Sequence, residues 1–183
     1  MGKIYVTSDL HFYHDKPFLY SPRGFISVQE MNDAIIRNWN NVVEDDDIVY
    51  VLGDIMLVNN ELGCKCFNQL KGYKIIILGN HDTDNRIKLY CKLRGVNGVK
   101  RADQIKYNGY SFFLCHYPTL ASNYDIDKPL KKRLINLCGH THTKDKFLDM
   151  DKGLIYHCEL DAHNNTPVAL DDIIIDLKEY LGE

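Results

Sequence analysis

The 183-residue sequence has no long apolar run, no excess of positive charge and few closely spaced cysteines. Because no apolar run approaches roughly 18 residues, the sequence predicts no transmembrane helix and no membrane partner. The first residues lack the apolar core of a signal peptide, so we expect a cytoplasmic protein. Lys and Arg number 22 against 25 Asp and Glu. The net charge therefore does not indicate a nucleic-acid partner, although it leaves a local basic patch open.

The cysteine spacing does not favour a zinc knuckle. Of the six cysteines, only Cys64 and Cys66 lie close together, as C-x-C, and the usual zinc spacing is C-x2-C. We expect reduced thiols, as in most cytoplasmic proteins. Cys115 and Cys138 come just before polar motifs at predicted strand ends. Since neighbouring residues of a strand face opposite sides, we interpret both as core residues rather than ligands.

The composition is typical of one globular domain over residues 1–183. Hydrophobic residues make up 45% of the chain and charged residues 26%, a balance that excludes disorder and a coiled coil. A chain of this length can bury roughly 70% of its unfolded surface without disulfides. No repeat or linker divides the chain, and no pattern indicates the oligomeric state.

Strand and helix patterns alternate in the first half of the chain. A capping box, Ser27-Val28-Gln29-Glu30, opens a helix with apolar residues through Val42. Further helices are predicted at residues 62–70, 87–93 and 170–181. Strands are predicted at residues 3–8, 48–52, 73–78, 134–138 and 154–159. The dipeptide Asn108-Gly109 between two strand patterns predicts a hairpin with a type I′ turn. The order predicts an α/β protein with two sheets or one mixed sheet.

Five of the predicted strands are followed directly by Asp, Asn or His residues. The segments are Asp9-Leu10-His11, Gly53-Asp54, Gly79-Asn80-His81-Asp82, His116 and Gly139-His140-Thr141-His142. In open α/β sheets the ligand crevice lies outside the carboxyl ends of the strands, so these side chains should converge there. D-x-H is expected about 0.8 times by chance, but G-H-x-H only about 0.02 times and G-N-H-D about 0.004 times. The two longer motifs are therefore specific, whereas D-x-H carries little weight on its own.

These residue types suit a pair of transition-metal ions. Mixtures of imidazole and carboxylate favour Mn, Fe, Zn or Ni over Ca and Mg. Asp9 and His11 are two apart, so an extended backbone points both toward one ion. His140 and His142 share that spacing, which would point both toward one ion. On a tight loop after Gly139 they could instead point toward two neighbouring ions. Asp54 has two oxygens and is the natural bridge. Two metals about 3.5–4 Å apart would clamp an in-line displacement at phosphorus.

On these segments, the sequence resembles the calcineurin-like metallophosphoesterases over residues 3–145, and residues 159–168 more weakly resemble small bacterial and phage members. The resemblance implies a four-layer α-β-β-α sandwich of two mixed sheets with a dinuclear centre, for which we expect Mn²⁺, with Fe, Zn or Ni as alternatives. It implies that the first metal is held by Asp9, His11 and His142. It implies that the second is held by Asn80, His116 and His140.

The same resemblance assigns the remaining roles. Asp54 is implied to bridge the metals, and a bridging hydroxide to attack phosphorus. His81 is implied to be the general acid that protonates the leaving alkoxide, with Asp82 as its orienting partner. The expected function is hydrolysis of small-molecule phosphate esters, with phosphodiesters or nucleotides favoured. Gly53-Asp54 is followed by Ile55-Met56-Leu57 without arginine, which disfavours a serine/threonine-type protein phosphatase. That activity and a non-catalytic scaffold of the same fold stay as alternatives.

Four further residues have open roles. His14 lies three residues after His11, and it either lines the substrate pocket or is a solvated loop residue. Arg23 either contacts a phosphate oxygen through its guanidinium or lies on the surface. Asp161 and His163 repeat the D-x-H pattern. Because the ligand set is already full, we interpret this pair as lying at the site rim or as structural.

Overall fold

The computed structural model describes residues 2–120 and 127–183, and five of its strands form the first sheet, in the order β4-β3-β2-β1-β9. Their bounds are Ile4–Thr7 (β1), Ile48–Val51 (β2), Tyr73–Ile77 (β3), Val96–Lys100 (β4) and Val168–Ala169 (β9). Strands β1 to β4 pair in parallel, whereas β9 pairs antiparallel with β1. The carboxyl ends of β1, β2 and β3 therefore lie side by side at one edge of this mixed sheet.

The second sheet has four strands in the order β5-β6-β7-β8. Their bounds are Asp103–Tyr107 (β5), Tyr110–Leu114 (β6), Leu134–Cys138 (β7) and Ile155–His157 (β8). The β5–β6 hairpin is antiparallel, and the remaining neighbours are parallel. Asn108 and Gly109 have φ values of 49° and 83°. Both are positive, as the predicted type I′ turn requires.

Within residues 2–120 and 127–183, five helices accompany the sheets: α1 (Pro17–Tyr20), α2 (Val28–Val42), α3 (Asn60–Phe67), α4 (Asp84–Tyr90) and α5 (Leu170–Leu181). Short 3-10 turns span Leu130–Lys132 and Leu160–Ala162. The predicted N-cap is present, since the Ser27 side chain accepts a hydrogen bond from the Glu30 amide. The Glu30 carboxylate accepts from the Ile26 amide at 2.8 Å, one residue before the amide used in a capping box. Helices α3 and α4 each begin and end a few residues earlier than predicted. Among the described residues, no helix combines the length and apolar character needed to cross a bilayer.

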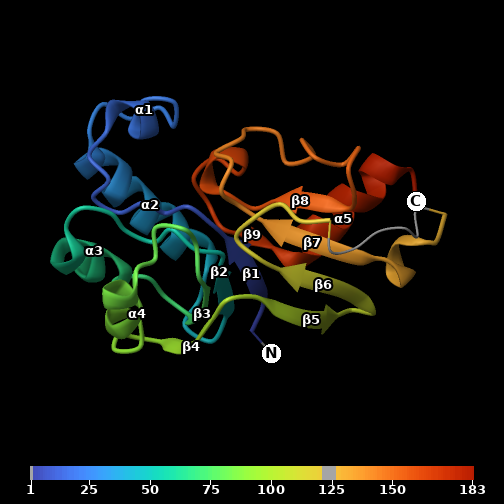
Figure 1. Cartoon of the computed structure of the whole chain (residues 1–183), viewed down its shortest axis with the longest axis horizontal. Coiled ribbons are helices and arrows are strands. Elements are labelled where there is room, and N and C mark those ends of the chain that lie inside the picture. The colour runs from blue at the N-terminus through green and yellow to red at the C-terminus, as the bar shows by residue number, and fades with distance from the viewer. Residues whose placement is uncertain (1, 121–126) are drawn as a thin grey trace.

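Figure 1 shows the two sheets with helices on their outer faces, and two clusters of buried apolar side chains lie between these layers. The first lies between the first sheet and helices α2 to α4, and it buries Trp39, Phe67 and Tyr90. The second lies between the two sheets and α5, and it includes Leu52 and Tyr156. The predicted α/β fold with two mixed sheets is confirmed. All six cysteines lie within the described residues as free thiols; Cys138 is buried and Cys115 half-buried.

Candidate metal centre

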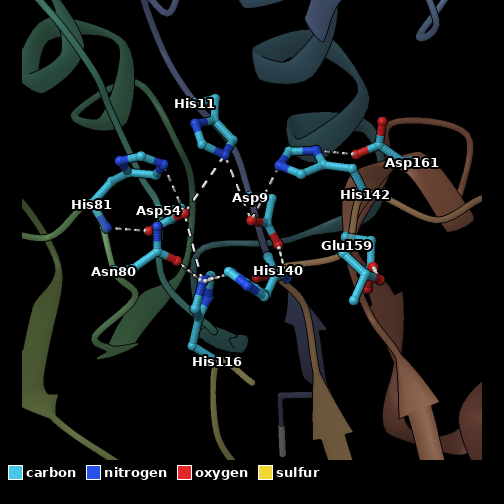
Figure 2. Close-up of polar contacts among 12 residues, drawn as sticks. Asp9, His11, Asp54, Asn80, His81, His116, His140, His142, Glu159 and Asp161 are labelled. Atoms are coloured by element: carbon cyan, nitrogen blue, oxygen red, sulfur yellow. Dashed lines mark hydrogen bonds and ion pairs between the residues drawn. The ribbon is translucent and has the colours of Figure 1, made fainter. Parts of the chain in front are cut away.

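The structure brings the seven predicted ligands into one cluster at the strand ends (Figure 2). They come from five loops: Asp9 and His11 after β1, Asp54 after β2, Asn80 after β3, His116 after β6, and His140 and His142 after β7. The parallel strands place their carboxyl ends together, so residues more than a hundred positions apart meet at one edge. The convergence expected from the motifs is thus present in the fold.

A first group of ligand atoms surrounds Asp9. Its Oδ1 lies 3.6 Å from His11 Nε2 and 3.7 Å from His142 Nε2. Asp54 Oδ2 lies 3.7 Å from the same His11 nitrogen. These separations are too long for hydrogen bonds. They approach the roughly 3.0–3.4 Å between atoms that each lie about 2.1 Å from a shared cation.

A second group adjoins the first through Asp54, whose Oδ2 lies 3.6 Å from His116 Nε2. Asn80 Oδ1 and His140 Nδ1 lie 2.9 Å and 3.2 Å from that same nitrogen. Two overlapping sets of side chains could hold an ion by their mutual distances: Asp9, His11 and His142, and Asp9, Asp54 and His116. One oxygen of Asp54 therefore faces both groups.

Two buried polar atoms in the first group lack hydrogen-bond partners. They are Asp9 Oδ1 and His11 Nε2, on residues that are 0% and 2% exposed. Buried polar atoms are nearly always paired, because leaving one unpaired costs about 1–3 kcal/mol. The two atoms lie 3.6 Å from each other, and carboxylate and imidazole are suitable donors for a divalent cation. The donor set thus fits a cation.

Hydrogen bonds on the far side of two imidazoles fix the nitrogen that faces the centre. His116 Nδ1 lies 2.7 Å from the Leu52 carbonyl oxygen, and His142 Nδ1 lies 3.1 Å from Asp161 Oδ2. A histidine that donates through Nδ1 keeps the lone pair of Nε2 free for a metal. Both rings therefore present an acceptor nitrogen to the cluster.

Arg23 does not lie on the surface, one of the two positions expected of it, and its guanidinium is bonded to other groups of the protein. The Arg23 side chain is 0% exposed and pairs with Asp161. Its Nε and Nη2 donate to the two carboxylate oxygens of Asp161 at 3.0 Å and 2.7 Å, and Nη2 also donates to the Asp9 carbonyl at 2.8 Å. Arg23 thus holds the carboxylate that orients His142. The structural role expected of Asp161 agrees with these contacts, and His163 bonds to the backbone oxygen of His157 at 2.8 Å.

Glu159 anchors the loop that carries His140 and His142, and the sequence analysis missed it. Its Oε1 accepts from Thr141 Oγ1 at 2.7 Å and from the Thr143 amide at 3.3 Å. His157 lies between Glu159 Oε1 at 3.2 Å and Asp149 Oδ2 at 3.0 Å. Burial opposes the charge on His157, but hydrogen bonds to the two carboxylates raise its pKa overall. The spacing of His157 and Glu159, two apart in a predicted strand, was the available signal.

His81 stands at the open side of the cluster. Its side chain is 42% exposed, and Nε2 lies 3.9 Å from Asp54 Oδ2. Its amide donates to Asp54 Oδ1 at 2.9 Å, and the Arg86 guanidinium donates to its carbonyl oxygen. The ring is therefore close to the centre and accessible, while its backbone is held in place.

Asp82 does not have the contacts expected of an orienting partner for His81. Its Oδ2 accepts from the amides of Asp54 at 3.0 Å and Gly79 at 2.8 Å. Its Oδ1 accepts from the Tyr90 hydroxyl at 2.5 Å. Both oxygens are thus engaged by other groups, and the carboxylate ties the loop after β2 to the loop after β3.

Five of the candidate ligands have backbone conformations that are uncommon outside glycine. Positive φ values occur at Asp9 (59°), His11 (50°), Asp54 (55°), His140 (78°) and His142 (53°). Such residues cost of order 1–3 kcal/mol each and cluster at functional sites. The strand-end loops therefore keep a strained arrangement that places these side chains at the centre.

Two glycines allow the loops to approach closely. A Cβ at Gly79 would lie 2.3 Å from Asp54 Oδ1, and one at Gly139 would lie 2.3 Å from Asp9 Oδ2. No side chain fits at either position without moving a candidate ligand.

Burial sets the charge states of the first group. Burial lowers the pKa of His11 to about 4, so the ring is neutral and able to donate a lone pair. Burial raises the pKa of Asp9, but the close approach of the His11 and His142 imidazoles lowers it overall. Burial also raises the pKa of Asp54. A nearby cation would stabilise that buried negative charge.

Comparison with known proteins agrees with this geometry. The family model for calcineurin-like phosphoesterases matches residues 2–173. The uncharacterised protein MJ1445 of Methanocaldococcus jannaschii is 36% identical over 180 residues, which cover 95% of this chain and 90% of that protein. The gene 66 protein of Mycobacterium phage L5 is 29% identical over 165 residues, covering 78% and 79%. The chain belongs to the calcineurin-like phosphoesterase family, as its motifs indicated.

A solved structure shows the same fold. The protein of unknown function AQ665 from Aquifex aeolicus superposes with a TM-score of 0.72 at 20% sequence identity. The match covers 94% of this chain and 98% of that one.

Proposed function

We propose that this protein hydrolyses phosphate esters at a centre of two divalent cations, with phosphodiesters or nucleotides as substrates. The observation that carries the proposal is the position of Asp54 Oδ2, 3.7 Å from His11 Nε2 and 3.6 Å from His116 Nε2. Each nitrogen belongs to a separate ligand group, so one carboxylate oxygen faces both. This arrangement supports a pair of neighbouring cations bridged by Asp54.

Asp9, His11 and His142 would hold the first cation, and Asn80, His116 and His140 the second. We expect Mn²⁺, with Fe, Zn or Ni as alternatives, because imidazole and carboxylate donors suit these ions. When bound, such a pair supplies Lewis acidity toward phosphoryl oxygens and lowers the pKa of water.

His81 is the proposed general acid. Its side chain is 42% exposed and its Nε2 is 3.9 Å from Asp54 Oδ2, so an ester at the centre can reach the ring. In the reaction, a water oxygen bonds to phosphorus and the bond from phosphorus to the leaving oxygen breaks. His81 gives its proton to that oxygen. The attacking water releases a proton to solvent, and His81 takes up a proton from solvent before the next turnover.

Assays of manganese-loaded protein on bis-p-nitrophenyl phosphate and p-nitrophenyl phosphate test the proposal. His81→Ala should lower the rate by roughly 10²–10⁴, while elemental analysis gives the metal content of the parent protein. An unchanged rate would exclude His81 as the acid. No turnover with both metals bound would contradict hydrolysis. Fewer than one metal per chain would favour a non-catalytic scaffold, and turnover of phosphoserine peptides alone would favour a protein phosphatase.

A further inference from the structure

A cleft of about 480 Å³ opens beside the first ligand group. Its polar lining comes from His11, His14, His81, His142 and Asp161. Its remaining lining is apolar and comes from Phe18, Leu19 and Pro22. The cleft therefore joins the candidate metal centre and the proposed acid to an apolar wall formed by Phe18 and Leu19 of α1 and by Pro22 after it. A substrate bound at the centre would place one of its ester groups against this wall.

Phe18 is an exposed aromatic residue on a well-anchored segment. Its side chain is 72% exposed, whereas the adjoining Leu19 is 5% exposed and packs in the first core. After α1, Arg23 fixes the chain through its ion pair with Asp161. The Phe18 ring lies 5.7 Å from the His14 ring at an interplanar angle of 88°, an edge-to-face contact. The segment that carries the ring is thus held in place before any ligand arrives, which lowers the entropic cost of binding.

The cleft has few groups suited to a highly charged ligand. No Lys or Arg occurs among its described lining residues. Arg23 lies behind it, with its side chain buried and paired to Asp161. A second phosphate group in the cleft would face the Asp161 carboxylate without a free cationic partner. The lining therefore favours a substrate with one charge at phosphorus and an uncharged flat group beside it.

We infer that the rings of Phe18, on the apolar wall, and of His14 beside it bind the planar aromatic group of a phosphodiester whose phosphorus lies at the metal centre. This group is a nucleobase or an aryl ring. Stacking on an aromatic side chain tolerates different bases, because every base has a flat π face. This inference rests on the proposed function for the position of phosphorus, and it adds the chemical class of the ester group.

Binding of a product nucleotide and, as a comparison without a ring, of inorganic phosphate to manganese-loaded protein tests the inference without requiring turnover. Adenosine 5′-monophosphate carries an aromatic ring, and inorganic phosphate does not. Phe18→Ala should weaken the nucleotide about fivefold to tenfold, the lower range for loss of one stacked base. It should change phosphate affinity less than about twofold. Phe18→Trp should restore nucleotide affinity. Ile175→Ala removes another exposed apolar side chain, 53% exposed on α5, and should change neither.

The tryptophan variant adds a direct signal. The natural chain has one tryptophan, Trp39, which is 0% exposed. Nucleotide stacking should quench the fluorescence of Phe18→Trp, and phosphate should not. Equal nucleotide affinity in the parent protein and Phe18→Ala, or equal losses for nucleotide and phosphate, would overturn the aromatic subsite. If the parent protein hydrolyses diesters in that case, the proposed function still stands; if it binds metal but lacks turnover, the proposed function fails separately.

Discussion

Asp161→Asn tests the support of the metal centre by residues that do not touch the metal. The carboxylate of Asp161 accepts from Arg23 at 3.0 Å and 2.7 Å and lies 3.1 Å from His142 Nδ1. The variant keeps the shape of the side chain and removes its charge. Losing the partner of a ligating histidine typically weakens metal binding 10–100-fold, or about 1.4–2.7 kcal/mol. We expect this loss for Mn²⁺ in a competition titration against a chromophoric chelator.

The same change leaves the Arg23 charge buried without a full partner, since its side chain is 0% exposed. Breaking such a pair costs about 3–5 kcal/mol. The amide oxygen of Asn still accepts a hydrogen bond, so we expect the free energy of unfolding to fall by about 3 kcal/mol, the lower end of this range. In a chain of this size that lowers Tm by about 6–12 °C in metal-free protein.

The double variant Arg23→Met/Asp161→Asn separates the two effects. Replacing both charges removes the unpaired guanidinium, so most of the lost stability should return. Metal affinity should stay low, because His142 still lacks a carboxylate partner. Wild-type affinity for Mn²⁺ in Asp161→Asn would refute the reasoning, as would full recovery of metal binding in the double variant.

Three further predictions follow from other parts of the structure. Gly139→Ala should weaken Mn²⁺ binding at least tenfold, because its Cβ would lie 2.3 Å from Asp9 Oδ2. Gly98→Ala should be tolerated in the same titration, because its nearest neighbour would be 3.9 Å away; equal effects would contradict the close approach. Glu159→Gln should weaken metal binding about tenfold, because it weakens the hydrogen bond that anchors the loop at Thr141. Unchanged affinity would show that the loop keeps its conformation without the Glu159 charge. Burial lowers the pKa of Lys74 to about 8 in the folded protein, whereas an unperturbed lysine has a pKa of about 10.4. Between these two pH values the unfolded chain binds a proton that the folded chain lacks. Stability should therefore rise with pH above about 8. Urea denaturation from pH 7 to 9.5 should show a smaller rise in Lys74→Met, and identical pH slopes would refute the assignment.

Local patterns predicted most of the regular elements. Strands β1, β2 and β3 are short apolar runs, and the Ser27 N-cap and the Asn108-Gly109 turn depend on neighbouring residues alone. Strand β4 contains Asn97 and Gly98, so its intrinsic strand propensity is weak. Its pairing with β3 holds it in the strand conformation. Strand β9 has two residues and exists through its pairing with β1. Neither strand has a pattern that a single sequence could reveal.

The candidate ligands were predictable because rare residue types follow strand ends in a specific order. The residues that hold them in place were not. The Arg23–Asp161 pair joins positions 138 residues apart, and no local pattern connects them. Asp82 lies beside His81 in sequence, yet its oxygens bond to the amides of Gly79 and Asp54. Sequence proximity suggested a partnership with His81 that these contacts do not include.

The stoichiometry and magnetic coupling of bound manganese test the central claim most directly. Electron paramagnetic resonance of the metal-loaded protein, with elemental analysis, should give two Mn²⁺ per chain with an exchange-coupled signal. Asp54→Asn should lose that coupling, because the oxygen that faces both ligand groups would no longer carry the bridging charge. Two uncoupled ions, or a single ion per chain at saturating manganese, would contradict the account.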